Sequence, residues 1–197
     1  TPYVGEAVKL FVYAIDTGAA IAGLATTKKI YIRAGTTLYD ITPIRATFTT
    51  STTPSTDNCF TTNTTTGTEG QVLVTLAGHG ATTGDFVTFT SAVAVGGITA
   101  PQLNLEFEVT VINANTFTIQ TAGTATSAAT GGGTGITAAF QINIGADSSI
   151  AGYGWGAGTW GRGTWGGASV LPAIVDVRLV FMDNFNNDLI FNLNNQG

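Results

Sequence analysis

Apolar and polar positions alternate along the first 45 residues of the chain. Three breaks, DTGA, TK and GT, separate four short runs, KLFVYAI, AIAGLAT, KKIYIRA and TLYDIT. In the third run, Ile30 and Ile32 alternate with Lys29, Tyr31 and Arg33, a spacing typical of a strand with two different faces. Connections this short allow only antiparallel neighbours, so residues 1–45 are predicted to form a four-stranded meander, the unit of a β-propeller blade.

The next stretch, residues 46–70, shows no such alternation. It is rich in Thr, Ser and Asn, as in TFTTSTTPSTDNCFTTNTTTG, and Pro54 interrupts any ladder of strand hydrogen bonds. We therefore expect a linker or an extended arm here.

Alternation returns in residues 71–145, where five further strand candidates are QVLVTLA, DFVTFTS, LEFEVTVIN, NTFTIQT and TAAFQINIG. Asn113, Ala114 and Asn115 supply a tight turn between the third and fourth of them. The run TAGTATSAATGGGTG is expected to be a flexible loop before the last strand. The pattern predicts a small β-sandwich or barrel, inserted as a separate domain into the propeller-type part.

Residues 146–197 begin with a Gly-rich segment in which Trp155, Trp160 and Trp165 recur every five residues. An extended chain would point the middle Trp away from the other two, so the intervening glycines are expected to turn the backbone and stack the aromatic rings. Packing of these rings on neighbouring strands is the first interpretation. Stacking on sugars or on single-stranded bases remains open, although Arg162 is the only cation in the segment.

The remaining sequence, AIVDVRLVFMDNFNNDLIFNLNN, predicts a return hairpin with DNFNN as its turn. One strand is expected to place Val175, Val177, Leu179 and Phe181 on a single face, and the other strand to do the same with Leu189, Phe191 and Leu193. Phe181 and Phe185, with the three Trp residues, are the candidates for structural or interaction contacts. The second strand is left at an edge, which further strands of a longer chain or a neighbouring subunit should cover.

The composition agrees with an all-β protein whose surface is largely covered by partner subunits. Charged residues make up 10% of the chain, and 26 residues are Gly, a mixture that strands and tight turns tolerate better than helices do. With so few charged residues, electrostatic repulsion between copies is weak, so the surface is expected to associate with other subunits. Because the chain begins at Thr1 and stops at Gly197 just beyond a strand, we expect it to be a segment of a longer polypeptide.

Charge is unevenly distributed. Five of the seven basic residues lie in the first 45 positions, and none lies between positions 46 and 161. This middle region is therefore not expected to bind nucleic acid tightly, because it has no cations to neutralise phosphates. No apolar run approaches the ~20 residues that a membrane-spanning helix needs, so no membrane span is expected.

Candidate catalytic or metal-binding groups are isolated. Cys59 is the single cysteine and has no motif around it, so a small buried thiol is the expected role. His79 has no visible partner for catalysis or metal binding and is expected to pack within its own loop. Glu106 and Glu108 share one strand face, which is expected to be solvated. The sequence thus predicts no enzyme, no cofactor and no metal site.

Three blocks of the sequence carry a resemblance to a known family. The run TTKKIYIRAGTTLYDITPIR (residues 26–45) is similar to a propeller-blade motif of phage virion proteins. A Gly-aromatic repeat like YGWGAGTWGRGTWG (residues 153–166) and a strand like VFMDNFNNDLIFNLNNQG (residues 180–197) follow in the same order in that family. Here Asn186 and Asn187 replace the usual Gly-Glu pair.

The resemblance implies a tail nozzle or tail tube protein located in the virion. Such a protein forms a ring of identical copies, contacts other tail proteins such as adaptor and fibres, and lets DNA pass through its lumen without specific binding. The family implies no catalytic residues. The alternative function is a host-glycan-binding adhesive module of the virion, and hydrolysis of surface polymer is a third class for which no residue pair is found.

Overall fold

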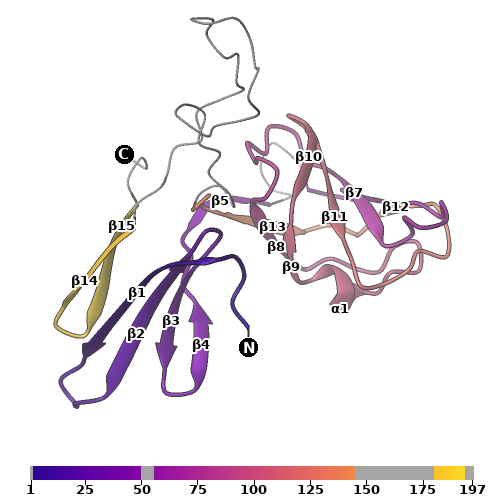
Figure 1. Ribbon diagram of the computed structural model, residues 1–197. Coiled ribbons are helices and arrows are strands. Elements are labelled where there is room, and N and C mark those ends of the chain that lie inside the picture. The colour runs from indigo at the N-terminus through magenta and orange to yellow at the C-terminus, as the bar shows by residue number, and fades with distance from the viewer. Residues whose placement is uncertain (1, 50–55, 145–179, 194–197) are drawn as a thin grey trace, which may run out of the picture. The chain divides into compact units, whose positions relative to one another are not determined.

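The computed structural model describes residues 2–49, 56–144 and 180–193, and strands dominate these residues (Figure 1). The all-β prediction is confirmed: every strand pairing among them is antiparallel, and one short helix, α1 (Ala100–Leu103), accompanies the strands. The chain divides into two compact units, of which one comprises residues 1–41 and 144–197 and the other residues 42–143.

The first unit contains the predicted meander. Its sheet has the strand order β1-β2-β3-β4, formed by β1 (Ala7–Ala14), β2 (Ala20–Thr26), β3 (Ile30–Ala34) and β4 (Thr37–Asp40). Each strand pairs with its successor in the chain. The three connections are the predicted breaks, and Gly18 and Gly35 occupy the left-handed region at φ +78° and +59°, where a residue without Cβ is favoured.

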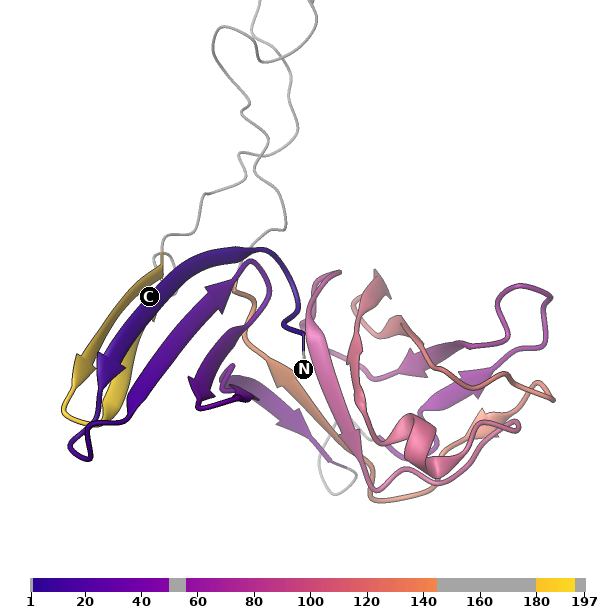
Figure 2. The ribbon, with the colours of Figure 1, turned by 60° about the horizontal axis from the view of Figure 1, so that its bottom comes forward.

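The hairpin β14 (Val180–Phe185) and β15 (Asp188–Leu193) packs against one face of this meander (Figure 2). Contact is so close at Gly23 in β2 that a Cβ there would lie 2.9 Å from Cδ2 of Leu189. Polar contacts hold the hairpin turn, since the backbone N–H of Asp16 donates to Oδ1 of Asn187 at 2.9 Å. The hydroxyl of Tyr13 donates to the carbonyl oxygen of Asn187 at 3.3 Å.

Burial around β3 does not follow the alternation of its residues. Ile30, Tyr31 and Lys29 are all buried, with Lys29 only 1% exposed. The residues before β1 account for part of this burial, because the backbone N–H of Val4 donates to the Tyr31 hydroxyl at 3.0 Å. Nζ of Lys29 forms an ion pair with Oδ2 of Asp40 at 2.6 Å, which compensates the burial of its charge.

The second unit is a two-sheet β-structure. One sheet has the order β10-β11-β7-β6-β12 and the other the order β5-β13-β8-β9. The strands of the first are β6 (Phe60–Thr62), β7 (Gln71–Thr75), β10 (Thr110–Asn113), β11 (Thr116–Gln120) and β12 (Thr130–Gly131). Those of the second are β5 (Ile44–Phe48), β8 (Phe86–Thr90), β9 (Glu106–Glu108) and β13 (Thr137–Gln141).

Aromatic rings fill the interior of the second unit. Phe60 and Phe89 meet edge to face at 4.9 Å between ring centroids, and Phe117 meets Phe140 in the same way at 5.8 Å. All four are fully buried, in a cluster with aliphatic residues from both sheets. The unit therefore buries a continuous core of its own.

Strands also occupy the stretch that the sequence marks as a linker. β5 forms one edge of its sheet beside β13, and β6 lies inside the other sheet between β7 and β12. Phe60 is fully buried and the neighbouring Cys59 is 3% exposed, so this Thr-rich stretch contributes directly to the core. β12 likewise lies in the run that was expected to be a flexible loop.

Candidate interaction surface

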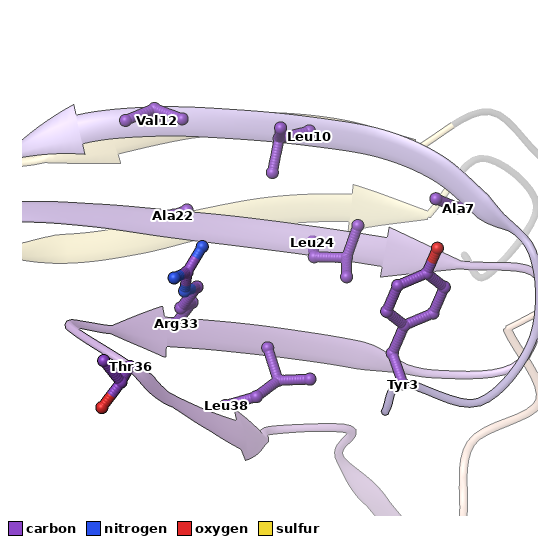
Figure 3. Close-up of a pocket in the computed structure, with 9 residues that line it drawn as sticks. All are labelled: Tyr3, Ala7, Leu10, Val12, Ala22, Leu24, Arg33, Thr36 and Leu38. Atoms are coloured by element: carbon purple, nitrogen blue, oxygen red, sulfur yellow. The ribbon is translucent and has the colours of Figure 1, made fainter. Parts of the chain in front are cut away.

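An apolar groove lies on the face of the meander opposite the hairpin (Figure 3). It encloses about 570 Å³. Most of its lining is apolar and comes from Tyr3, Ala7, Leu10, Val12, Ala22, Leu24 and Leu38. Arg33 and Thr36 supply the polar lining.

Strand register builds this groove. Leu10 of β1 lies opposite Leu24 of β2, and Val12 lies opposite Ala22. Ala22 is in turn opposite Arg33 of β3, which faces Leu38 of β4. Residues directly opposite in neighbouring strands share a face, so Val12, Ala22, Arg33 and Leu38 form one row across four strands. Leu10 and Leu24 lie in the next row on the same face.

The groove is open to solvent. Leu10 is 63% exposed and Val12 is 59% exposed, although both lie in the middle of a strand. Single exposed apolar residues are common, but a contiguous apolar patch on a sheet face usually marks a contact with a partner. The chemistry of the groove suits packing against another apolar surface, with Arg33 as its one cation.

The hairpin presents a second exposed apolar surface. Phe181, Phe185 and Ile190 are 60%, 71% and 53% exposed. They alternate with side chains that face the meander, where Met182 pairs with Phe191 and Val180 with Leu193. We call the surface formed by Phe181, Asp183, Phe185, Asp188 and Ile190 the outer face of the hairpin.

Among the candidate contact residues from the sequence, the structure thus places Phe181 and Phe185 on one exposed face. Trp155, Trp160 and Trp165 lie outside the described residues, as do Val175, Val177 and Leu179. The predicted face of Leu189, Phe191 and Leu193 is the one that turns toward the meander, as half-buried or buried side chains.

His79 has the structural role that the sequence predicts. It is 1% exposed and lies beside the rings of Phe117 and Phe140, at centroid distances of 5.0 and 6.3 Å. Its Nδ1 accepts the backbone N–H of Ala81 at 3.0 Å, so its Nε2 is the nitrogen that donates to the carbonyl oxygen of Asn113 at 3.0 Å. Both ring nitrogens thereby have a hydrogen-bond partner within the core.

The other titratable candidates are also structural. Cys59 is buried, and burial raises the pKa of its thiol to about 12. Glu106 and Glu108 both lie on the exposed face of β9, as expected. Oε1 of Glu106 accepts a hydrogen bond from Nε2 of Gln141 at 2.8 Å.

A polar cluster around Asp85 has no signal in the sequence. This carboxylate is 4% exposed and accepts hydrogen bonds from Thr82 and from Nδ2 of Asn143, the latter at 2.7 Å. Arg45 lies 3.5 Å away and stacks over the Phe140 ring. The cluster ties β5, the loop before β8 and the end of β13 together, which is a structural task.

The described residues contain neither a cluster of metal ligands nor a membrane-spanning helix. No group of three His, Cys, Asp or Glu side chains in them has the geometry of a metal site. No helix in the described part of the chain is long and apolar enough to span a bilayer.

Comparisons with known proteins give a weak similarity among solved structures. No protein-family model matches the chain, and no curated protein matches it. Among solved structures, the phage phi92 endosialidase is similar with a TM-score of 0.39 and 21% sequence identity over 68% of this chain. The chain spans 19% of that protein's length, and at this TM-score the similarity carries no argument about function.

Proposed function

We propose that this chain is a structural subunit of a short-tailed phage tail, in the nozzle or tube ring that extends the DNA ejection channel. The observation that carries the proposal is the four-stranded meander, with apolar side chains on both faces of its sheet. The motif TTKKIYIRAGTTLYDITPIR, through which the chain resembles phage virion proteins, runs from the last residue of β2 into β5.

A blade of a propeller is a four-stranded antiparallel sheet whose faces pack on the neighbouring blades. In the first unit, Gly23 and Tyr13 face the hairpin, while Leu10 and Val12 face solvent. A sheet with apolar residues on both faces is stable only when both faces are covered. The need to cover both faces is expected of a subunit that packs inside an assembly, a role that needs no catalytic groups.

Charge supports a role beside DNA without tight binding. Between positions 46 and 161 the chain has no Lys or Arg, and its net charge is −5. Each phosphate neutralised by a cation adds salt-sensitive affinity, so a surface without cations lets DNA slide past. Other tail proteins, such as adaptor and fibres, are the partners that this role requires.

Immunogold labelling tests the proposal. Antibodies raised against the purified chain should label the tails of the phage particles that encode it, and averaged images of those tails should show ring symmetry. Purified particles without the chain, or with label on the capsid alone, would overturn the proposal.

A carbohydrate array separates the adhesive alternative from the nozzle or tube role. The full chain should show no glycan binding above that of a denatured control. If it binds a defined host glycan and labels only the fibre tips, the chain is an adhesive module and the nozzle or tube proposal fails.

A further inference from the structure

The first unit carries two exposed apolar surfaces. One is the groove on the meander, centred on Leu10 and Val12. The other is the outer face of the hairpin, with Phe181, Phe185 and Ile190. Exposing an apolar surface to water costs free energy. Two such surfaces on one small unit indicate that each is covered by a contact with a partner.

The two surfaces lie on opposite sides of the unit. The inner face of the hairpin packs on the meander at Gly23, where Leu189 and Met182 approach. Leu24 is the next residue of the same strand and points to the opposite face, into the groove. In Figure 3 the pale yellow hairpin passes behind the strands that carry the labelled groove residues. The outer face of the hairpin therefore points away from the groove.

The charges on the two surfaces are opposite. The groove contains Arg33, which is exposed and whose Nε donates to the carbonyl oxygen of Gly35 at 3.0 Å. The outer face of the hairpin contains Asp183 and Asp188, both exposed. Groove against groove would bring two arginines together, and hairpin against hairpin would bring aspartates together. Only groove against hairpin places unlike charges at the contact.

We infer that the outer face of hairpin β14–β15 of one copy docks into the meander groove of the next copy. This inference deepens the proposed function, on which it rests for the setting of the assembly, by naming the partner surface and its orientation. Because the two surfaces differ and lie on opposite sides of one unit, the contact is heterologous. Repetition of such a contact closes into a ring or continues as a filament. Phe185 and Phe181 enter the groove, and Arg33 faces the aspartates.

Cross-linking between two single-cysteine variants tests the pairing directly. Leu10→Cys marks the groove and Ile190→Cys marks the hairpin, while the native Cys59 is buried and serves as the background in the wild-type chain. With a short bis-maleimide, the mixture of the two variants should give cross-linked dimers in at least about tenfold excess over either variant alone. The full chain is used throughout.

Three outcomes overturn the inference. A Leu10→Cys variant that cross-links to itself as well as the mixture does would show groove-to-groove pairing. Oligomers seen by analytical ultracentrifugation in a mixture that gives no cross-link would place the interface elsewhere, while leaving the proposed tail role intact. A chain that stays monomeric at every concentration refutes the docking as well.

A charge exchange gives an independent readout that misfolding cannot imitate. Arg33→Glu and Asp183→Arg should each raise the apparent dissociation constant of self-association about tenfold, a change of ~1.4 kcal/mol. The double variant should return to within about threefold of wild type. Glu108→Arg, on exposed β9 of the other unit, makes the same change in net charge as Asp183→Arg and should leave association unchanged. A double variant as weak as the single ones contradicts the docking.

Discussion

The two units of this chain handle their apolar residues in different ways. In residues 42–143, two sheets enclose a core in which Phe60, Phe89, Phe117 and Phe140 are fully buried. In the described residues of the other unit, a four-stranded sheet is covered on one face by a hairpin, and Leu10 is 63% exposed. The difference indicates that one unit satisfies its own core, while the other depends on further contacts for the same purpose.

Shortening the chain should have the largest effect on folding, because a fragment loses whole strands rather than single side chains. We predict that residues 42–143 fold alone and that residues 71–145 do not. The shorter fragment lacks β6, which lies between β7 and β12, and it lacks Phe60 from the core. Two-dimensional NMR of both fragments tests this, because a folded fragment gives well-dispersed amide signals and an unfolded one does not. A folded 71–145 fragment would show that β5 and β6 are dispensable.

Substitutions in the two units should next differ in how much they lower the free energy of unfolding. Phe117→Ala leaves a cavity among fully buried rings and should lower the free energy of unfolding by about 3–5 kcal/mol. Leu10→Ala removes an exposed side chain and should change it by less than about 0.5 kcal/mol in the monomer, while weakening self-association. Urea unfolding at low protein concentration measures both. Equal costs would refute the contrast between the units.

The meander could be predicted because local rules and tertiary structure agree there. Its turns contain Gly18 and Gly35, and its strands are short runs of alternating residues. The run LFVY within β1 is apolar on both faces, which is a signal that both faces of the sheet require cover. The apolar run in β1 thus indicates that an exposed apolar face exists. Which residues line the groove depends on the register of β1 with β2 to β4, and the sequence alone does not give this register.

Strands β5 and β6 escaped prediction for different reasons. β5 alternates apolar and polar residues, but it crosses the predicted boundary between residues 45 and 46, whereas β6 shows no alternation. Among threonines, which suit strands and loops alike, only Cys59 and Phe60 mark the position of β6. The sequence also did not tell whether Phe181 faces the meander or solvent. The structure places it on the exposed side, opposite Val180 and Met182, because the register of the hairpin sends those two side chains toward the meander.

Contact between the hairpin and the meander can be weakened without touching either exposed surface. A Cβ at Gly23 would lie 2.9 Å from Cδ2 of Leu189, closer than packed side chains tolerate. Gly23→Ala should therefore cost about 1–3 kcal/mol by overpacking. Thermal unfolding of the variant measures the loss.

A second substitution shows whether overpacking is the cause. Leu189→Ala makes room for the new methyl group, so the double variant should be less destabilised than the sum of the two single variants by about 1 kcal/mol. Strict additivity would mean that the hairpin does not pack on Gly23 as described.

The smallest effect is expected from pH acting on the core of residues 42–143. Burial raises the pKa of Cys59 to about 12, and the nearby Asp57 carboxylate adds to the increase. In the unfolded chain a cysteine thiol titrates near pH ~8.5. The folded state therefore keeps a proton that the unfolded state loses, so stability is fully present below that pH and falls as pH rises from about 8.5 toward 12.

The rate of this fall is at most about 1.4 kcal/mol per pH unit, so between pH 8 and 10 the wild-type chain should lose about 1–2 kcal/mol through Cys59. Tyrosines and lysines titrate in the same range, and Cys59→Ala isolates the thiol because the cavity it leaves costs the same at both pH values. Urea unfolding of both proteins at pH 8 and pH 10 gives the difference. An identical loss in wild type and variant would mean that the thiol ionises as freely in the folded core as in water, and the closed interior of this unit would then have to be reconsidered.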